Sequence, residues 1–146
     1  MRVEQISVFL VNQAGRLAEV TQILSEAGVN IRALFLVDNF DQGVLRMIVN
    51  DNKKAEEALK GQGFSVSKTN VVAVEVEDKP GGLHKILDIL QKAMINVEYM
   101  YAFVRKSGIN AMMIFRFNQP DEAVKLLTEK GVTVVDGKDV VNGKEI

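Results

Sequence analysis

The chain has 146 residues, of which 47% are hydrophobic and 25% are charged, and it contains no cysteine. This length suits one ordinary domain or two small ones that share a core. Without cysteine there is no disulfide framework, no thiolate metal site and no cysteine nucleophile. The 18 basic residues nearly balance the 19 acidic ones and form no cluster, which argues against nucleic acid or an anionic membrane as the main partner.

No stretch of the sequence approaches the roughly 18 continuous apolar residues that a membrane span needs. Met1–Leu10 also lacks the apolar region of a secretory signal. We therefore expect a cytoplasmic protein, and no motif in the sequence indicates catalytic residues, a metal ion or a cofactor.

The first half of the chain is predicted to contain six elements. Ile6 and Leu10 belong to an alternating, strand-like run, and the apolar residues from Leu17 to Ala27 recur at helical spacing. Two strands, a short helix and a last strand follow, at Asn30–Asp38, Val44–Asn50, Lys53–Lys60 and Phe64–Lys68. The predicted order is βαββαβ.

The second half of the chain repeats the first. At an offset of 66 residues, six identities are found: Gly15, Leu17, Ile23, Leu24, Ala27 and Asn30 fall on Gly81, Leu83, Ile89, Leu90, Ala93 and Asn96. After an indel of two residues the register resumes at an offset of 68, where Ala55, Leu59, Gly63 and Val66 fall on Ala123, Leu127, Gly131 and Val134. The second copy is therefore predicted to contain the same six elements, at Val72–Val76, Leu83–Ala93, Asn96–Arg105, Ile109–Phe117, Pro120–Lys130 and Val132–Asp136. The copies join near Thr69 and Asn70.

This order predicts an α+β fold in which each copy is a ferredoxin-like unit, with an antiparallel sheet and both helices on one face. We assign residues 1–69 to the first domain and residues 70–146 to the second. Several strands are apolar on both faces, with Tyr99 and Tyr101 on one side and Met100 on the other. The second face therefore needs a partner. We expect the units to pair within the chain and the remaining apolar surface to form a homodimer.

The stretch DKPGGL, Asp78–Leu83, joins a predicted strand to a predicted helix. The first turn of a helix offers unpaired N–H groups and the positive end of the dipole, which suit the carboxylate of a free amino acid. Gly81 and Gly82 let a ligand approach the backbone closely. Asp78 can accept from the ammonium in a charge-assisted hydrogen bond worth about 1.5 to 3 kcal/mol. Asn96, at the start of the next strand, offers both a donor and an acceptor.

The succession of a strand, D-K-P-G-G-L, an amphipathic helix and I-N-V at the next strand resembles the ACT domain family. Its members are small-molecule sensing modules, usually for amino acids, that act on enzymes of amino-acid metabolism. The resemblance covers nearly the whole chain, and NVEYMYAFV (Asn96–Val104) and GVLRMIV (Gly43–Val49) are similar to stand-alone tandem ACT proteins. In the family, the residues that match Asp78 and Asn96 contact the ligand. The resemblance implies a ligand-binding set in each copy: Asp78, Pro80, Gly81, Gly82, Leu83 and Asn96 in the second, and Asn12, Ala14, Gly15, Arg16, Leu17 and Asn30 in the first.

The first copy departs from the pattern of the second. Its turn reads NQAGRL, with Asn12 in the place of Asp78 and Ala14 in the place of Pro80. Loss of the proline leaves the turn less rigid, and loss of the carboxylate removes a partner for a cation. We expect the two sites to differ in affinity or in ligand.

Purely structural interpretations of these residues compete with ligand binding. Asp78 is placed to cap the following helix, with Pro80 in its first turn. Asn30 and Asn96 can hydrogen-bond the local backbone at a strand entry.

Other functions of the same strand order are less well supported. Acylphosphatase needs an arginine after its first strand, where Arg16 lies, but the surrounding pattern is absent. An RNA-binding plait needs basic and aromatic residues on a central strand, which INAMMIFRF does not provide. A heavy-metal-binding plait needs C-x-x-C, and a protein-interaction module with vestigial ligand sites stays open. We predict a non-catalytic amino-acid-binding sensor or regulatory protein, whose ligand lies between the helix-start loop of one unit and a neighbouring unit, and whose partner is an enzyme of amino-acid metabolism.

Overall fold

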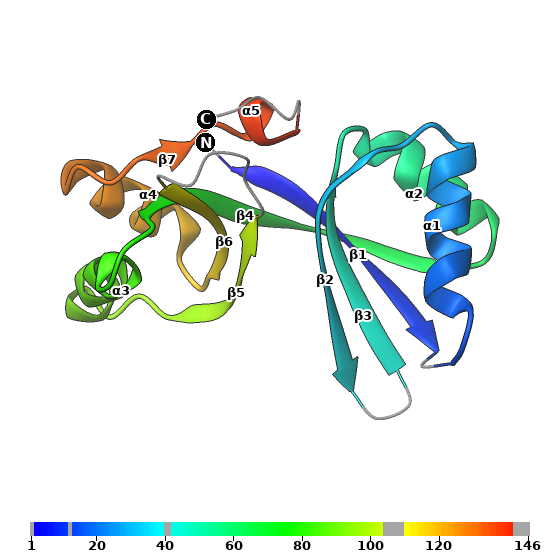
Figure 1. Ribbon diagram of the computed structural model, residues 1–146, viewed down its shortest axis with the longest axis horizontal. Helices are drawn as coiled ribbons and strands as arrows, with labels where there is room; N and C mark the ends of the chain where they lie inside the picture. Colours follow the sequence, from blue (N-terminus) through cyan, green and yellow to red (C-terminus); the bar gives the residue numbers. More distant parts are fainter. Residues whose placement is uncertain (1, 12, 40–41, 104–109, 142–146) are drawn as a thin grey trace. The chain divides into compact units, whose positions relative to one another are not determined.

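The computed structural model describes residues 2–11, 13–39, 42–103 and 110–141 (Figure 1). The chain divides into two compact units, one made mainly of Glu4–Thr69 and the other mainly of Asn70–Val140. We call them the N-terminal unit and the C-terminal unit. No helix in the described ranges is long and apolar enough to cross a membrane.

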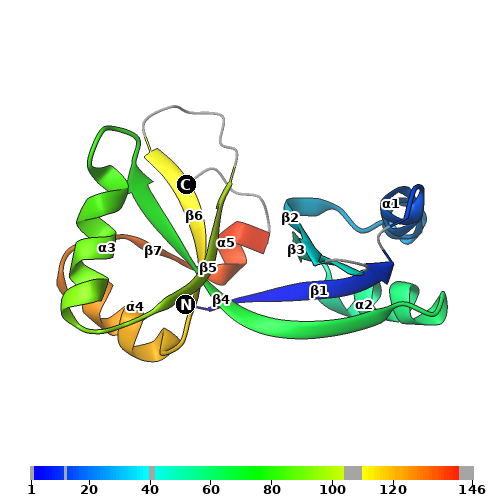
Figure 2. The same cartoon turned by 90° about the horizontal axis from the view of Figure 1, so that it is seen from below.

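The N-terminal unit follows the predicted order of elements. It contains β1 (Val3–Val11), α1 (Arg16–Glu26), β2 (Ile31–Asn39), β3 (Gln42–Val49), α2 (Asn52–Gly61) and the beginning of β4 (Ser65–Glu77). The strand order is β2-β3-β1-β4, and β3 pairs antiparallel with both β1 and β2. Figures 1 and 2 show α1 and α2 on the same side of this sheet.

The C-terminal unit repeats this arrangement. After the second part of β4 it contains α3 (Gly82–Lys92), β5 (Val97–Phe103), β6 (Asn110–Phe117), α4 (Pro120–Glu129), β7 (Val134–Val135) and α5 (Gly137–Val141). The strand order is β5-β6-β4, β7 pairs with the free side of β4, and the pairs are antiparallel. The predicted α+β fold of two ferredoxin-like units is therefore confirmed.

The helices are held to their sheets by apolar residues at equivalent positions. Val20 and Leu24 are the buried residues of α1, and Ile86 and Leu90 are the buried apolar residues of α3. Each set packs with the inward-facing residues of its own sheet into one core cluster. The helical spacing read from the sequence thus identifies the faces that fix both helix starts in place.

The junction of the two copies differs from the prediction. Two strands with a joint at Thr69 and Asn70 were expected, but Ser65–Glu77 is a single strand of 13 residues. The joint contains no glycine or proline to turn the chain, and it continues into the β-branched pair Val71 and Val72, which favours extended backbone. The helix α5 was not predicted either, and the last predicted strand is shortened to Val134–Val135.

Candidate functional site

The turn between β4 and α3 is fixed by backbone hydrogen bonds. The Gly82 N–H donates to the Lys79 carbonyl at 3.0 Å, and the Lys85 N–H donates to the Gly81 carbonyl at 3.0 Å. Gly81 has a φ of 86°, in the left-handed region that favours glycine. A side chain at Gly81 would meet no atom within 4 Å, so the backbone there faces open space.

The turn between β1 and α1 has two equivalent hydrogen bonds and a glycine in the same left-handed region. The Arg16 N–H donates to the Gln13 carbonyl at 3.2 Å, the Glu19 N–H donates to the Gly15 carbonyl at 3.0 Å, and Gly15 has a φ of 89°. Ala14 and Leu17 are exposed. Asn12 lies outside the described residues, so the position of its side chain stays a prediction.

Neither helix begins with a side-chain cap from the described residues. The N-cap positions are Gly15 and Gly81, and neither α1 nor α3 has a side-chain cap hydrogen bond among the described residues. Asp78 is exposed, and it does not cap α3 as the structural interpretation required. The N–H groups of Arg16 and Gly82 are bonded within their turns, but no side-chain cap covers the positive end of either helix dipole, which suits an anionic group.

Gly82 is needed for close packing against β4, whereas Gly81 is needed for its left-handed backbone. A Cβ at Gly82 would lie 2.0 Å from the carbonyl oxygen of Glu77, which is a backbone atom. The space that the missing side chain leaves is thus filled by the chain itself, and Gly82 allows the start of α3 to approach the end of β4. A ligand can approach the open backbone of Gly81 but not this side of Gly82.

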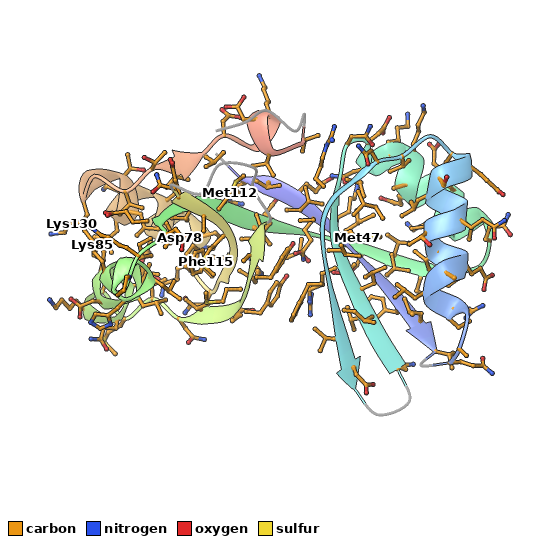
Figure 3. The ribbon with its side chains drawn as sticks, viewed as in Figure 1. Met47, Asp78, Lys85, Met112, Phe115 and Lys130 are labelled. Carbon is orange, nitrogen blue, oxygen red and sulfur yellow. The ribbon has the colours of Figure 1, made fainter. Side chains whose placement is uncertain are left out.

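A cavity of about 140 Å³ lies beside this close approach. It is several times the roughly 30 Å³ that one water occupies in the liquid, so it has room for a small organic group. Polar and charged residues contribute most of its wall, and the full lining is Glu75, Glu77, Gly82, Lys85, Ile86, Asn110, Gly131, Val132 and Thr133. Figure 3 labels Lys85 on α3, and it labels Asp78, which does not line the cavity.

The charges at the cavity are arranged in pairs. The Lys79 ammonium lies 2.7 Å from one Glu77 carboxylate oxygen, and Lys85 lies 3.9 Å from the other. The hydrogen bond from Lys79, followed by the charges of Lys79 and Lys85, lowers the pKa of the Glu77 carboxyl, and the same hydrogen bond raises the pKa of Lys79. The Asn110 amide donates to Glu75 at 2.7 Å. Glu77 therefore keeps its negative charge at neutral pH.

In the N-terminal unit, the Arg16 side chain contacts other side chains of the same unit. The Arg16 guanidinium lies 4.7 Å above the centre of the Phe64 ring, and it forms an ion pair of 2.7 Å with Glu19. Leu17 lines a separate small groove of about 80 Å³ between α1 and the strands, together with Leu36 of β2. Arg16 is therefore engaged by its own unit, which gives no support to an acylphosphatase-like phosphate site.

The two asparagines at the strand entries lie at the other end of each unit. Asp78 precedes α3 and Asn96 follows it, and a helix of 11 residues is about 16 Å long. No small molecule can touch both residues within one unit. The prediction that they share a ligand therefore requires the loop of one unit and the asparagine of another.

The backbone of each entry asparagine is held by a second asparagine that the sequence analysis missed. The Asn118 side chain accepts from the Asn96 N–H at 3.0 Å, and the Asn50 side chain accepts from the Asn30 N–H at 2.8 Å. The structural interpretation had the asparagine side chains bond the local backbone, whereas these bonds join the backbone N–H of Asn30 or Asn96 to a side chain 20 or 22 positions away. The exposed side chains of Asn30 and Asn96 are not used by these bonds.

The remaining predicted residues lie on the turn before α3 or in its first turn. Pro80 is exposed in the turn, and Leu83 is half-buried against the core of the C-terminal unit. Apart from Gly82, sequence reasoning missed the wall of the cavity, for which the signal was a difference between the copies. Phe64 of the first copy is replaced by Val132 in the second, and Phe9 by Glu75.

The comparisons with known proteins agree with this geometry. A family model described as an ACT domain pair matches residues 1–143. The chain belongs to the ACT domain pair family. The two strand–turn–helix junctions are thus the equivalent loops of two ACT domains. No curated protein matches the sequence.

Solved structures share the fold of this ACT domain pair. Protein BT0572 from Bacteroides thetaiotaomicron is 38% identical, with a TM-score of 0.91, over 97% of this chain and 96% of that one. The regulatory subunit of aspartate kinase from Thermus thermophilus is 18% identical, with a TM-score of 0.60, over 86% of this chain and 91% of that one. The regulatory subunit from Thermus flavus is 17% identical, with a TM-score of 0.55, over 86% and 90%. At the two lower identities the likeness concerns the fold alone.

Proposed function

We propose that this ACT domain pair is a non-catalytic amino-acid-binding sensor or regulatory protein. The observation that carries the proposal is the turn before α3. At this turn the backbone is open at Gly81, the start of α3 has no side-chain cap, and a polar cavity lies beside it. The family model of an ACT domain pair matches residues 1–143 of the chain. These features suit a small zwitterion better than an extended or apolar ligand.

The ligand's two charged groups have separate partners in this proposal. Its carboxylate accepts from the N–H groups at the start of α3, and its ammonium donates to Asp78. Asn96 contacts a ligand held by the loop of a neighbouring unit, because it lies at the opposite end of its own unit. The set Asn12, Ala14, Gly15, Arg16, Leu17 and Asn30 forms the corresponding weaker site of the first domain, residues 1–69, and the stronger site belongs to the second domain, residues 70–146.

The proposed role in the cell is regulation of an enzyme of amino-acid metabolism. The Thermus structures of similar fold are regulatory subunits of aspartate kinase, which supports a regulatory partner without naming it. We propose that the chain forms a homodimer in the cytoplasm and that ligand occupancy favours one arrangement of units. A ligand shifts such an equilibrium only by its different affinities for the two arrangements.

A thermal-shift screen of the common amino acids tests the proposal. A ligand present at 100 times its dissociation constant stabilises the folded chain by about 2.7 kcal/mol, which raises the melting temperature by several degrees. We expect one or a few chemically related amino acids to do so at millimolar concentration. A screen in which no amino acid raises the melting temperature would remove the basis of the sensor function.

The Asp78→Ala variant tests the ammonium contact. Loss of a charge-assisted hydrogen bond weakens binding by about 2 kcal/mol, or roughly 30-fold, in isothermal titration. Because Asp78 is exposed and caps no helix, we expect the stability of the free protein to change by less than about 0.5 kcal/mol. The matched control is Asp88→Ala on the middle of α3, which should leave affinity intact. Equal affinities for the Asp78 variant and the parent would show that the ammonium lies elsewhere.

A further inference from the structure

The groove of about 80 Å³ in the N-terminal unit is lined mainly by aliphatic side chains. Figure 1 shows the end of β1, the start of α1, the end of β2 and the start of β3 at the same end of this unit. The aliphatic residues around the groove are Leu10, Val11, Leu17, Leu36 and Val37, and Gln13, Asp38 and Gly43 complete its described lining. The groove therefore lies beside the turn that precedes α1.

Gly43 leaves the floor of the groove open. It pairs with Leu10 of β1 and with Asp38 of β2, so these three positions form one row across the sheet. Paired residues share a face, and Leu10 belongs to the core under the helices, so a side chain at position 43 would point toward the helices. A Cβ there would lie 3.6 Å from a methyl carbon of Leu36, which also lines the groove. The absent side chain thus leaves room inside the groove.

The fold itself does not require glycine at position 43. The φ of Gly43 lies outside the left-handed region, and the atoms nearest to an added Cβ, at 3.6 Å, are at ordinary contact distance. Glycine inside a strand weakens it and often marks a place where a ligand approaches the backbone closely. In the second copy the corresponding residue is Ala111, which pairs with Val76 as Gly43 pairs with Leu10. A strand of the same plan therefore accepts a side chain at this position.

The aliphatic walls of the groove are partly exposed to water. Val11 is 52% exposed, Leu36 is 48% exposed and Leu17 is 36% exposed. A ligand with an aliphatic group would remove this surface from water, which favours its binding. The groove has two to three times the roughly 30 Å³ that one water occupies in the liquid. It therefore suits the few carbon atoms of a short side chain and excludes a peptide segment.

The groove also has partners for both charges of an amino acid. Leu17 is the second residue of α1, so the groove lies next to the positive end of the helix dipole, which suits a carboxylate. Asp38 is exposed and brings a carboxylate to the groove from β2, which suits an ammonium. Aliphatic walls between these two charges match the three parts of an aliphatic amino acid.

We propose that this groove is the side-chain pocket of an amino-acid site in the N-terminal unit, and that it takes a branched aliphatic side chain in the room left by Gly43. The inference rests on the proposed function, and it names the ligand class of the first domain. In the second copy, Ala111 replaces Gly43 and Ala102 replaces Leu36. The open floor and the aliphatic wall are thus features of the first copy, and the second domain does not share this preference.

Isothermal titration of the full chain with valine, leucine and threonine tests the ligand class. Threonine has the shape of valine with a hydroxyl group in place of one methyl group, and an aliphatic pocket disfavours that hydroxyl group. We expect valine or leucine to bind at least about tenfold more tightly than threonine. If another amino acid binds but valine and leucine do not, or if threonine binds as tightly as they do, the inference is overturned and the proposed function stands. If no amino acid binds, both are refuted.

Two substitutions with matched controls test whether the aliphatic ligand lies in the groove. Gly43→Ala adds a methyl group to its floor and should weaken binding of valine or leucine at least about fivefold. The control Gly61→Ala adds a methyl group that meets nothing within 4 Å, and it should change the affinity by less than about twofold.

Leu36→Ala removes part of the wall and should also weaken this binding at least about fivefold. Its control is Leu34→Ala, because Leu34 lies on the same face of β2 and is 51% exposed, but does not line the groove. We expect that control to change the affinity by less than about twofold. Melting temperatures verify that all four variants are folded. An unchanged affinity in Gly43→Ala or Leu36→Ala, or an equal loss in its control, would overturn the inference.

Discussion

The Gly82→Ala substitution tests the contact that brings the start of α3 against the end of β4. The added Cβ would lie 2.0 Å from the Glu77 carbonyl oxygen and 3.0 Å from the carbonyl carbon. Both are backbone atoms, so a change of rotamer cannot relieve the overlap, and the carbonyl has to move by about 1 Å or more. The same carbonyl accepts from the Lys79 N–H at 3.0 Å, and this movement weakens that bond.

The magnitude follows from three contributions to the free energy of unfolding. Forcing a methyl group into filled space costs about 1 to 3 kcal/mol. Loss of the backbone hydrogen bond of Lys79 costs about 1 kcal/mol. Replacing a helical glycine by alanine stabilises by up to about 1 kcal/mol. We therefore expect Gly82→Ala to lower the free energy of unfolding by about 1 to 3 kcal/mol.

Urea unfolding followed by circular dichroism measures this change, and Gly61→Ala is the matched control. Gly61 is also helical, at the end of α2, but a Cβ there would meet nothing within 4 Å. Helix propensity alone then predicts stabilisation by up to about 1 kcal/mol. The two substitutions should thus have opposite signs. A Gly82→Ala variant as stable as the parent would show that the helix start does not need this close approach.

Three further changes test individual contacts. Met94 is 84% exposed and has a φ of 57°, in the left-handed region that favours glycine. Met94→Gly should therefore raise the free energy of unfolding by about 1 kcal/mol in the same urea assay, and a loss of stability would contradict this. Asn118→Ala should lower the free energy of unfolding by about 1 kcal/mol because the Asn96 N–H loses its acceptor at 3.0 Å, whereas Asn118→Asp should keep that acceptor. Equal losses of stability in the two variants would refute the contact. The pKa of Glu77, measured by carboxyl NMR, should lie below the ordinary glutamate value and rise in Lys79→Met. Because that pKa is lowered in the folded state, the contact stabilises the folded protein at pH values above the ordinary glutamate pKa of about 4.3, and its contribution is lost as the pH falls through the lower folded pKa. An unchanged pKa of Glu77 in Lys79→Met would exclude Lys79 as the cause.

The sequence was sufficient to predict the fold because the chain repeats itself. Leu24 and Leu90 fall on one another at an offset of 66 residues, and each is buried in the core of its unit. When one apolar pattern occurs twice, few arrangements of strands and helices bury the apolar face of the helices and of the sheet in both copies. The single strand Ser65–Glu77 was missed because one strand was predicted for each copy, on either side of the joint at Thr69 and Asn70, although the sequence there has no residue that would turn the chain.

The candidate site was predictable only where it depends on local backbone geometry. The glycines Gly15 and Gly81 mark left-handed backbone before a helix, and the structure has a φ of 89° and 86° at these positions. The cavity beside Gly82 depends instead on residues from distant segments, among them Asn110 and Thr133. No spacing rule brings these segments together, since their proximity comes from the pairing of β4 with β6 and from the path that follows α4.

Identities and differences between the copies therefore carry different information. The identical glycines lie where the backbone has positive φ, so the fold itself selects them. Arg16 and Gly82 both begin a helix, but the backbone around them differs, because a Cβ at Gly82 would lie 2.0 Å from the Glu77 carbonyl oxygen, whereas Arg16 carries a Cβ. The close approach of the Glu77 carbonyl explains why residue 82 is glycine, and the Phe64 ring explains where the Arg16 side chain rests. The repeated pattern thus specifies the elements that the two units share, whereas the polar cavity beside Gly82 depends on residues such as Glu75 and Val132, which differ from their counterparts Phe9 and Phe64.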